Sequence, residues 1–576
     1  MSTETIDQSG PEDPPGPPGR GEPPAGEGGD AQAREPDFTV VGIGVAVVAG
    51  VVAWAAIGKK SFESASSTAL AWVLENFAWL FVIAADVFLV LCVVIAVSRF
   101  GRIRLGKDDS EPEFTNLAWI AMMFSAGMGI GLMFYGVGEP LQHYLSPPPA
   151  MAGVEPRTPA AAGTALQYSF FHWTFTPWAI YGIAGLALAY AGFRKGRGNR
   201  LSSVFVPLIG ARRAEGWPGR LIDLLAVFAT VFGTATSLGV GTLQVSKGLN
   251  LTTGLEDSTT VEVIIIVALG AAFVGSAFSG LHKGVKWLST LNIVLAACLM
   301  TFVFVIGPTV FILDAIPAGV GNYLIGLVPM ATRTGAFTDG SWLGSWTIFY
   351  WAWWLSWAPF VGTFIARISR GRTIREFLIG VLLVPSAATV VWFCVMGGTG
   401  IRLDETGKAD MAAEIAEGPE AALFAMLDAL PLGVVTSWIA MLLVMTYFVT
   451  SADSASLVMG SLTSRGALHP RTWLVVTWGV LMAAVAAVLL VAGGLTSLQS
   501  ATILVALPFV VVMLALCWAL LKELREDPGA GPARHHALHG LRDAVKAMVG
   551  DAITEQSPTR HHRLRRAVKS RSQEED

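Results

Sequence analysis

Long apolar stretches alternate with short polar loops from Phe38 to about residue 521. Most of these stretches reach about 20 residues, the length that a helix needs to cross the hydrocarbon core of a bilayer. The pattern predicts twelve membrane-spanning helices, at residues 39–58, 77–97, 117–136, 166–191, 222–248, 261–280, 288–312, 346–365, 376–397, 433–459, 472–493 and 499–521. An even number of crossings places both termini on one side of the membrane.

The charges of the loops indicate which side that is. Loops after even-numbered spans are rich in Lys and Arg, as in SRFGRIRLGK (98–107) and ARISRGRTIR (366–375), whereas LEDSTT (255–260) is acidic. Cytoplasmic loops carry an excess of positive charge, so both termini are predicted to be cytoplasmic. Residues 313–338 are expected to be too short and too Gly-rich to cross, and to form an amphipathic helix along the membrane.

Two polar tails flank the predicted transporter domain at residues 39–521. Residues 1–38 hold nine acidic residues against two Arg, with many Pro and Gly, and are predicted to be disordered. Residues 522–576 include the basic run RHHRLRRAVKSR, which can bind anionic membrane lipids. That tail can instead pair with the acidic N-terminal tail, or serve only as a solvated segment.

Composition excludes several classes of protein. Hydrophobic residues make up 53% of the chain and charged residues only 14%, against about 25% charged in soluble proteins. The sequence has no clustered basic footprint of a nucleic-acid-binding domain. It also lacks metal-ligand spacing, a nucleophile elbow and a nucleotide-binding loop, so we expect no catalytic residues, no enzyme activity and no organic cofactor.

Glycines cluster in the third span, in SAGMGIGLMFYGVGEP. Gly127, Gly129 and Gly131 each disfavour a helix by about 1 kcal/mol relative to Ala. Such a segment can unwind at the middle of the membrane and expose carbonyls to a solute or ion. The alternative is close packing of helices through small residues.

Aromatic residues cluster in the fourth and eighth spans. The three in the fourth span fall within an arc of about 140° on one helix. Tryptophan often anchors a helix at the membrane edge, whereas a tight cluster can form a cage for a quaternary ammonium group. The residues concerned are Trp173, Trp178, Tyr181, Trp353, Trp354 and Trp357.

Hydroxyl pairs provide a candidate cation site. Thr230 and Thr234 share a face of the fifth span, and Thr450 and Ser451 follow Tyr447 by three and four residues. Hydroxyl oxygens and freed carbonyls together can surround a hard monovalent cation. Membrane Ser and Thr also commonly hydrogen-bond within their own helix, which is the alternative.

Ionisable residues in or near the spans are few. Carboxylates such as Glu139 and Asp223 are functional candidates by default, but most of them lie near predicted helix ends and are expected to cap them. His172 is expected to be a hydrogen-bonded core residue.

Together, AGMGIGLMFYG, the W-x4-W-x2-Y spacing of the fourth span and FYWAWWLSWAPFVGTFIARISRGRTIREF resemble the betaine/carnitine/choline transporter family, from about residue 39 to 521. The likeness is to its sodium-coupled, osmotically regulated glycine betaine carriers. It implies an all-α integral membrane fold with two accessory helices and a five-plus-five inverted repeat (spans 3–7 and 8–12). It also implies a homotrimer in the bacterial cell membrane.

The resemblance also implies site residues. An aromatic box for the substrate would comprise Trp173, Trp178, Tyr181 and Trp354, with Trp353 and Trp357 beside it and the substrate carboxylate near Gly127, Gly129 and Gly131. One sodium ion would be held by carbonyls of Ser125, Met128 and Tyr447 and by the hydroxyls of Thr450 and Ser451. A second would be held by Thr230, Thr234 and Phe360.

The resemblance thus implies sodium symport of a zwitterionic osmolyte, glycine betaine, by alternating access under hyperosmotic stress. Ser125 and Tyr447 replace the Ala and Phe of similar carriers, but both would contribute only carbonyls. Gly131 is uncharged where proton-coupled choline carriers tend to have Asp, which favours a zwitterion. The alternatives are proton-coupled choline transport, sodium-coupled ectoine or proline transport, and an uncoupled channel or osmosensor.

Overall fold

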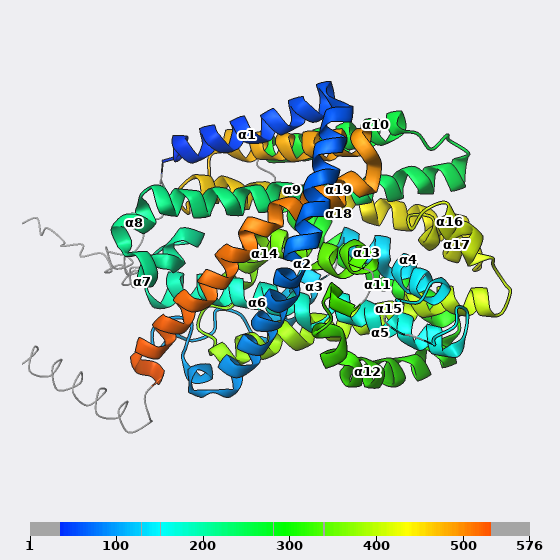
Figure 1. Cartoon of the computed structure of the whole chain (residues 1–576), viewed down its shortest axis with the longest axis horizontal. Coiled ribbons are helices and arrows are strands. Elements are labelled where there is room, and N and C mark those ends of the chain that lie inside the picture. The colour runs from blue at the N-terminus through cyan, green and yellow to red at the C-terminus, as the bar shows by residue number, and fades with distance from the viewer. Residues whose placement is uncertain are drawn as a thin grey trace, which may run out of the picture.

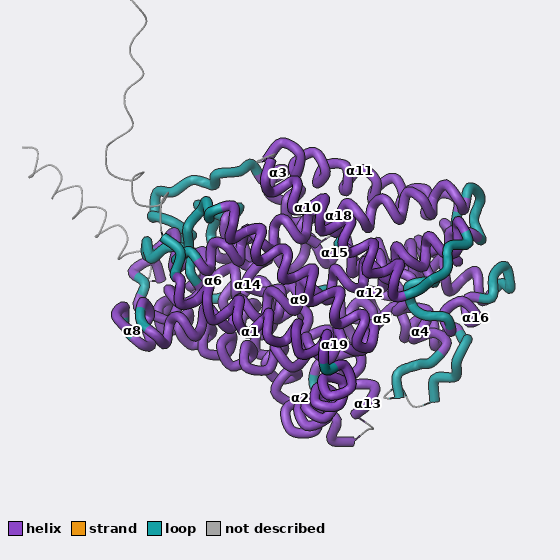
Figure 2. Tube along the Cα trace, turned by 90° about the horizontal axis from the view of Figure 1, so that it is seen from above, coloured by secondary structure: helices purple, strands orange, loops and turns teal. Residues whose placement is uncertain are grey.

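The computed structural model describes residues 35–127, 129–149, 151, 153–279, 282–337 and 340–530. Within those ranges the chain is helical, and the only strand-like pairing is an isolated antiparallel bridge between Arg104 and Thr373. Figure 2 shows helices through the body of the molecule and loops gathered mainly at two opposite ends. This arrangement is typical of a helical membrane protein.

Ten long helices form the body of the structure. They are α1 (Phe38–Ile57), α2 (Lys59–Val97), α9 (Trp217–Thr253), α10 (Thr259–Ser279), α11 (His282–Ile306), α12 (Thr309–Ala331), α14 (Phe349–Arg367), α15 (Ile374–Glu405), α18 (Gly433–Thr463) and α19 (Thr472–Glu526). Among the described residues, nine helices are long and apolar enough to cross a membrane, namely all of these except α14. The predicted all-helical membrane fold is confirmed, while the number twelve stays a prediction.

The helix α19 contains two of the predicted spans. Its 55 residues are interrupted only at Gly493 and Gly494, where the backbone leaves helical geometry. Gly494 has a φ of +61°, in the left-handed region that favours glycine. Figure 1 shows the orange ribbon of α19 turning back on itself. The predicted boundary between residues 493 and 499 is therefore a tight reversal without a loop.

Two other predicted spans are each split into shorter helices. The third consists of α3 (Asn116–Gly127) and α4 (Ile130–Leu145), separated at the extended residue Gly129. The fourth consists of α5 (Pro159–Trp173) and α6 (Phe175–Ala189), separated at Thr174. The glycine cluster thus does interrupt a helix, but Gly131 lies inside α4 and the interruption is shorter than expected.

The prediction for residues 313–338 is partly wrong. This stretch forms most of α12, which has 23 residues and is long enough to cross a membrane. Pro317 and Pro329 lie inside the helix without ending it. The proposed position of α12 along the membrane surface stays a prediction.

Short helices connect the long ones. The α-helices are α7 (Val206–Ile209), α8 (Ala211–Glu215), α13 (Gly340–Leu343), α16 (Met411–Ala416) and α17 (Ala422–Asp428). The 3₁₀ and π helices are η1 (Arg99–Arg102), η2 (Tyr190–Arg194), η3 (Leu201–Phe205), η4 (Gly335–Phe337), η5 (Gly344–Ile348) and η6 (Pro528–Ala530).

The helix α9 forms the centre of the bundle. Its most apolar stretch is 78% buried, against 11% for that of α10. It packs against α4, α14, α18 and α19, so helices from both halves of the sequence surround it. Figure 1 places both described ends of the chain on the left-hand side of this bundle.

Candidate binding site

A cavity of about 90 Å³ lies where the interrupted helices meet α14. This volume suits a small solute. Eight of the nine predicted binding residues line it, namely Gly129, Gly131, Trp173, Trp178, Tyr181, Trp353, Trp354 and Trp357. Gly127 ends α3, and its contacts lie outside the described part of the structure.

The aromatic rings of the cavity pack mostly edge to face. The rings of Trp173 and Trp354 lie 4.9 Å apart with their planes at 80°. Tyr181 is perpendicular to Trp354, at 6.0 Å and 89°, and to Trp178, at 5.4 Å and 78°. Faces and edges therefore alternate around the cavity, and the electron-rich faces can attract a cation.

Gly131 allows two of these rings to approach the backbone of α4. A Cβ atom at this position would lie 2.8 Å from Cη2 of Trp173 and 3.0 Å from Cη2 of Trp353. Any side chain would therefore push the indoles away from their observed positions. The structure thus gives Gly131 a steric role at this position.

The indole N–H groups hold the walls in place. Trp354 donates from Nε1 to the carbonyl of His172 at 2.9 Å. Trp353 donates to Oγ of Ser237 at 3.2 Å, which joins α14 to α9. The buried Nε1 of Trp357 has no hydrogen-bond acceptor among the described residues.

A buried polar cluster lies directly behind Trp173. Glu139 is fully buried inside α4, so the expectation that it caps a helix end is wrong: the helix continues through Pro140. His172 bonds Glu139 through Nδ1 at 2.7 Å and Thr347 through Nε2 at 3.1 Å, which confirms it as a hydrogen-bonded core residue. Ligand atoms of Glu139, His143 and His172 lie within 4.8 Å of one another. Glu139 and His143 are one helical turn apart on α4, but no sequence spacing links them to His172.

A second cavity, of about 190 Å³, adjoins the first through Trp357, Val361 and Ser451, which line both. Tyr447, Thr450, Ser451 and Phe360 all line this second cavity, although the resemblance divides them between two cation sites.

Asn292 on α11 completes the polar wall of this second cavity. Its Nδ2 donates to Oγ1 of Thr450 at 3.2 Å, and its Oδ1 is buried without a hydrogen-bond partner.

The remaining predicted cation ligands lie elsewhere. Thr230 and Thr234 are buried on α9, and Thr230 donates to the carbonyl of Ala226 in its own helix. Their helix meets α14 closely, because a Cβ at Gly233 would lie 2.6 Å from Cβ of Ser356. Ser125 belongs to α3, with its side chain outside the described part, and Met128 lies outside the described residues.

Several lining residues were not predicted. Ser237 is one of several hydroxyl residues of α9, Thr389 lies on α15, and Asn292 is a lone amide in α11; none of the three belongs to a predicted motif. Ile130, Leu132, Pro177 and Val361 complete the first cavity. Only the tertiary packing of distant helices reveals these positions.

Comparison with known proteins identifies the family of this chain. Residues 39–529 match the betaine/carnitine/choline family of transporters. The chain is 44% identical over 491 residues to the glycine betaine transporter OpuD of Bacillus subtilis, covering 85% of this chain and 94% of that protein.

Two further relatives have similar levels of identity. The betaine/ectoine transporter LcoP of Corynebacterium glutamicum is 42% identical over 90% of this chain and 81% of its own length. A glycine betaine transporter of Acinetobacter baylyi is 43% identical over 84% of this chain and 72% of its own length. The family and these relatives are transporters and not enzymes, and they place such proteins in the cell membrane. The chain is a multi-pass membrane transporter of the betaine/carnitine/choline family.

Proposed function

We propose that the chain imports glycine betaine by sodium symport. The observation that carries this proposal is the convergence of six aromatic residues and Gly131 on one cavity. A trimethylammonium group has no hydrogen-bond donors, so ring faces are its natural binding partners. The printed names of OpuD and the Acinetobacter protein support betaine as the substrate.

The polar surroundings of the cavity suit the other end of a zwitterion. The buried N–H of Trp357 is available to donate to a carboxylate. No carboxylate side chain lines the first cavity among the described residues, which favours a substrate with its own negative charge over choline.

Sodium coupling rests on the hydroxyls beside this cavity. Thr450, Ser451 and the unpartnered carbonyl oxygen of Asn292 surround the second cavity. Oxygen ligands of this kind suit a hard cation. Ser451 lines both cavities, so a cation bound there would lie beside the substrate and favour its binding.

The wider arrangement follows from the family resemblance. Spans 3–7 and 8–12 would form inverted repeats, and alternating access would come from movement of one bundle against the other. The split helices α3/α4 and α5/α6 support this proposal, since interrupted helices surround the substrate sites of such transporters. A homotrimer with cytoplasmic termini completes the proposed arrangement.

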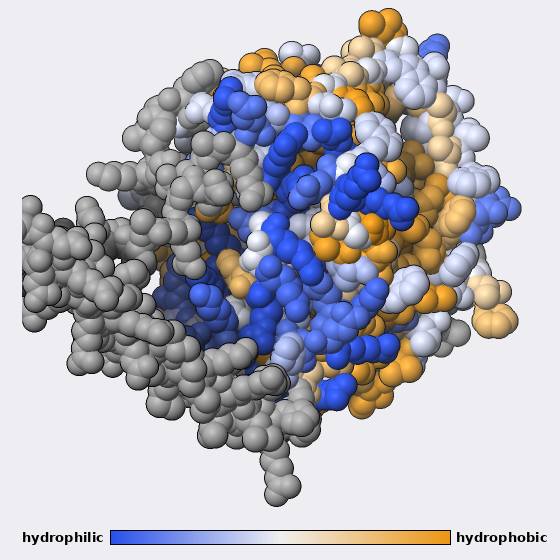
Figure 3. All heavy atoms as spheres, turned by 90° about the vertical axis from the view of Figure 1, so that its left-hand side faces the viewer, coloured by the Kyte–Doolittle hydropathy of each residue, from blue (hydrophilic) through white to orange (hydrophobic). Residues whose placement is uncertain are grey.

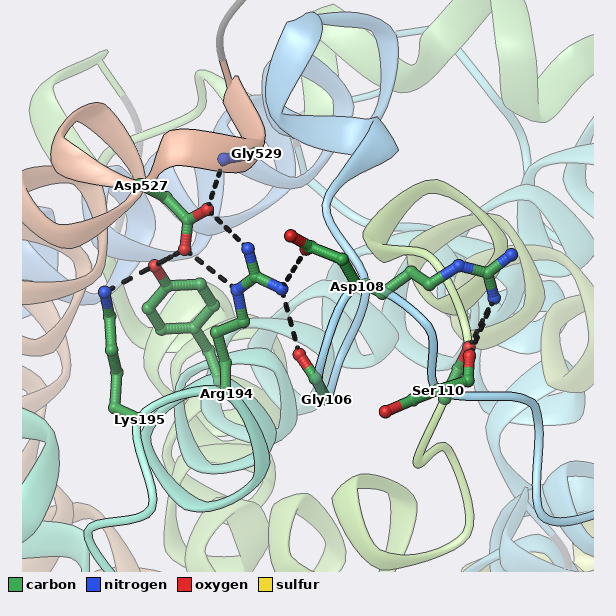
Figure 4. Close-up of polar contacts among 10 residues, drawn as sticks. Gly106, Asp108, Ser110, Arg194, Lys195, Asp527 and Gly529 are labelled. Carbon is green, nitrogen blue, oxygen red and sulfur yellow. Dashed lines mark hydrogen bonds and ion pairs between the residues drawn. The ribbon is translucent and has the colours of Figure 1, made fainter. Parts of the chain in front are cut away.

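Regulation by osmotic stress would act through the two tails. Figure 3 shows hydrophilic residues gathered on the face from which both tails begin. Arg197, Arg200 and Arg465 line a cavity of about 760 Å³ together with Glu35 and Glu215. The excess of Arg favours anionic lipids or the acidic N-terminal tail. The root of the C-terminal tail is held by an ion-pair network around Asp527 (Figure 4).

Uptake of radiolabelled betaine into proteoliposomes tests the proposal. We expect saturable uptake that needs an inward sodium gradient, is absent with potassium, and rises with osmolality. Uptake of betaine driven only by a proton gradient would contradict sodium coupling.

Ectoine is a second candidate, because one relative is a betaine/ectoine transporter. If ectoine is taken up with sodium and betaine is not, the proposed sodium coupling stands and ectoine replaces betaine as the substrate.

A further inference from the structure

The carboxylate of Glu139 lies behind the wall of the binding cavity without lining it. Its Oε2 accepts a hydrogen bond from Nε1 of Trp173 at 2.7 Å and another from the hydroxyl of Tyr350 at 2.6 Å. Trp173 lines the cavity, whereas Glu139 does not. A bound solute therefore meets the indole and not the carboxylate.

The same carboxylate organises a second wall through Tyr350. The Tyr350 ring stacks on Trp354, with centroids 6.3 Å apart and planes at 13°. Trp354 lines the cavity. Glu139 therefore supports the aromatic lining twice, directly through Trp173 and indirectly through Tyr350. The contacts join α4, α5 and α14, three helices that come from both predicted repeats.

The contacts of His172 indicate which groups of the cluster donate and which accept hydrogen bonds. Oε1 of Glu139 accepts from Nδ1–H of His172 at 2.7 Å, and Nε2 of that neutral ring then accepts from the hydroxyl of Thr347 at 3.1 Å. A buried carboxylate with three donors is well satisfied. We favour this network over a metal site, because a 2.7 Å separation of Oε1 and Nδ1 is a hydrogen bond between the two groups.

The charge of Glu139 also acts on whatever the cavity holds. Charges interact more strongly in a buried environment than in water. The carboxylate accepts the indole N–H of Trp173, so its negative charge lies at the edge of a ring whose other atoms contact the cavity. A cation in the cavity gains from that charge, and a neutral group of the same shape does not.

We propose that Glu139 is a positioning and specificity-determining residue of the substrate site. Its hydrogen bonds hold Trp173 and Tyr350, and its charge favours a quaternary ammonium over an uncharged body of equal size. This inference rests on the proposed function, because it takes as substrate the zwitterion betaine, whose ammonium group carries the positive charge.

Glu139→Gln separates the charge from the hydrogen bonds. The amide oxygen of Gln can accept from Trp173 and Tyr350, while its NH₂ donates to Nδ1 of His172. The His172 ring then carries its proton on Nε2 and donates it to Thr347. Nε2 of His143, which lies 3.5 Å from Oε1 of Glu139, can face the second N–H of the amide as an acceptor. The hydrogen bonds to Trp173, Tyr350 and His172 are then kept and only the charge is lost, whereas Glu139→Leu removes both.

The experiment compares binding of two ligands to the purified full-length protein. One is glycine betaine and the other is 3,3-dimethylbutanoate, in which carbon replaces the charged nitrogen. Calorimetric titration in saturating sodium gives the ratio of the two dissociation constants. The control is Glu405→Gln, which removes a carboxylate paired with Arg402 at the end of α15.

We expect Glu139→Gln to weaken betaine binding about tenfold and to leave 3,3-dimethylbutanoate binding unchanged, so the preference for the cation falls. The maximal transport rate should change less than the affinity. Glu405→Gln should keep the preference of the unaltered protein. Glu139→Leu should weaken both ligands, because the rings lose their anchors.

Two results would overturn the inference. A Glu139→Gln protein with an unchanged ratio would show that the charge has no role, and equal weakening of both ligands would show only a structural role. Both results are measured on the Glu139→Gln protein, so they do not depend on whether Glu139→Leu folds. An unaltered protein that binds neither ligand would instead refute the proposed substrate, and this failure appears before any variant is measured.

Discussion

The guanidinium of Arg194 donates two hydrogen bonds to the carboxylate of Asp527, from Nε to Oδ2 at 3.1 Å and from Nη2 to Oδ1 at 2.9 Å. Arg194 ends η2, and Asp527 directly follows α19. Tyr190 donates to the same carboxylate, and Lys195 lies within ion-pair distance of it (Figure 4). The end of α19 is thus fixed to the loop after α6.

Asp527→Asn should lower the thermal stability of the purified protein. The variant loses hydrogen bonds to a charged group that is almost fully buried, an effect of about 2 kcal/mol. The measurement is the apparent Tm in detergent. Arg525→Gln changes an exposed charge on the same helix and is the control. Equal Tm values for the two variants would show that the network does not stabilise this end.

The same network predicts a loss of stability in acid. Burial alone would raise the pKa of Asp527, but hydrogen bonds from Arg194, Tyr190 and the backbone of Gly529 hold it below its usual value. A lowered pKa in the folded state stabilises the protein above about pH 4 and ceases to do so as the pH falls through the lowered value. Melting curves from pH 7 to 3 should therefore converge for the unaltered protein and Asp527→Asn at the acid end.

Gly131→Ala should weaken betaine uptake strongly. The added Cβ would meet Trp173 at 2.8 Å and Trp353 at 3.0 Å, so the cavity walls must shift. We expect a rise in KM of about tenfold, measured by initial rates in proteoliposomes.

Gly129→Ala is the comparison for that variant. It should lose less affinity, because nothing lies within 4 Å of its added Cβ and its extended backbone accepts any residue. The reverse order of losses would contradict the steric role of Gly131.

Thr450→Ala and Ser451→Ala should reduce the affinity for sodium. Each removes a hydroxyl from the second cavity, and we expect the sodium concentration for half-maximal uptake to rise about tenfold. Thr446 and Thr450 both donate to carbonyls of α18, but only Thr450 lines the second cavity, so Thr446→Ala is a matched control one turn earlier. Unchanged sodium dependence in both test variants would show that sodium does not bind in this cavity.

Deletion of residues 530–576 should leave uptake active at every osmolality. The deletion keeps Asp527 and the hydrogen bonds of its carboxylate with Arg194, Tyr190 and Gly529, so it removes the tail and leaves this network in place. Uptake is measured in iso-osmotic and hyperosmotic buffer. A deletion protein that is silent in iso-osmotic buffer would contradict regulation by this tail.

Much of the architecture could be predicted because helix length and hydropathy act locally. In the fourth span, Trp178 and Tyr181 lie one turn apart on α6, and Trp173 ends α5 before the break at Thr174. The expected arc on one helix is therefore wrong, although all three residues line one cavity. The glycine cluster does mark the interruption at Gly129. The one-turn spacing and this interruption both depend on neighbours in the sequence.

The polar cluster could not be predicted in this way. Glu139 and Tyr350 are 211 residues apart, and no spacing links them. Glu139 also precedes Pro140, which suggests a helix end although α4 continues beyond it. The long helix α12 was missed for a similar reason, because its prolines and glycines disfavour helix locally while the helix still forms.

The reversal at Gly493 and Gly494 gives α19 a mechanical property. Because no loop joins its two arms, the turn has no extra residues that could extend. One arm therefore cannot slide along its axis without displacing the other. A pull on the tail near Glu526 would therefore be transmitted to the arm that begins at Thr472 as a translation of the whole hairpin.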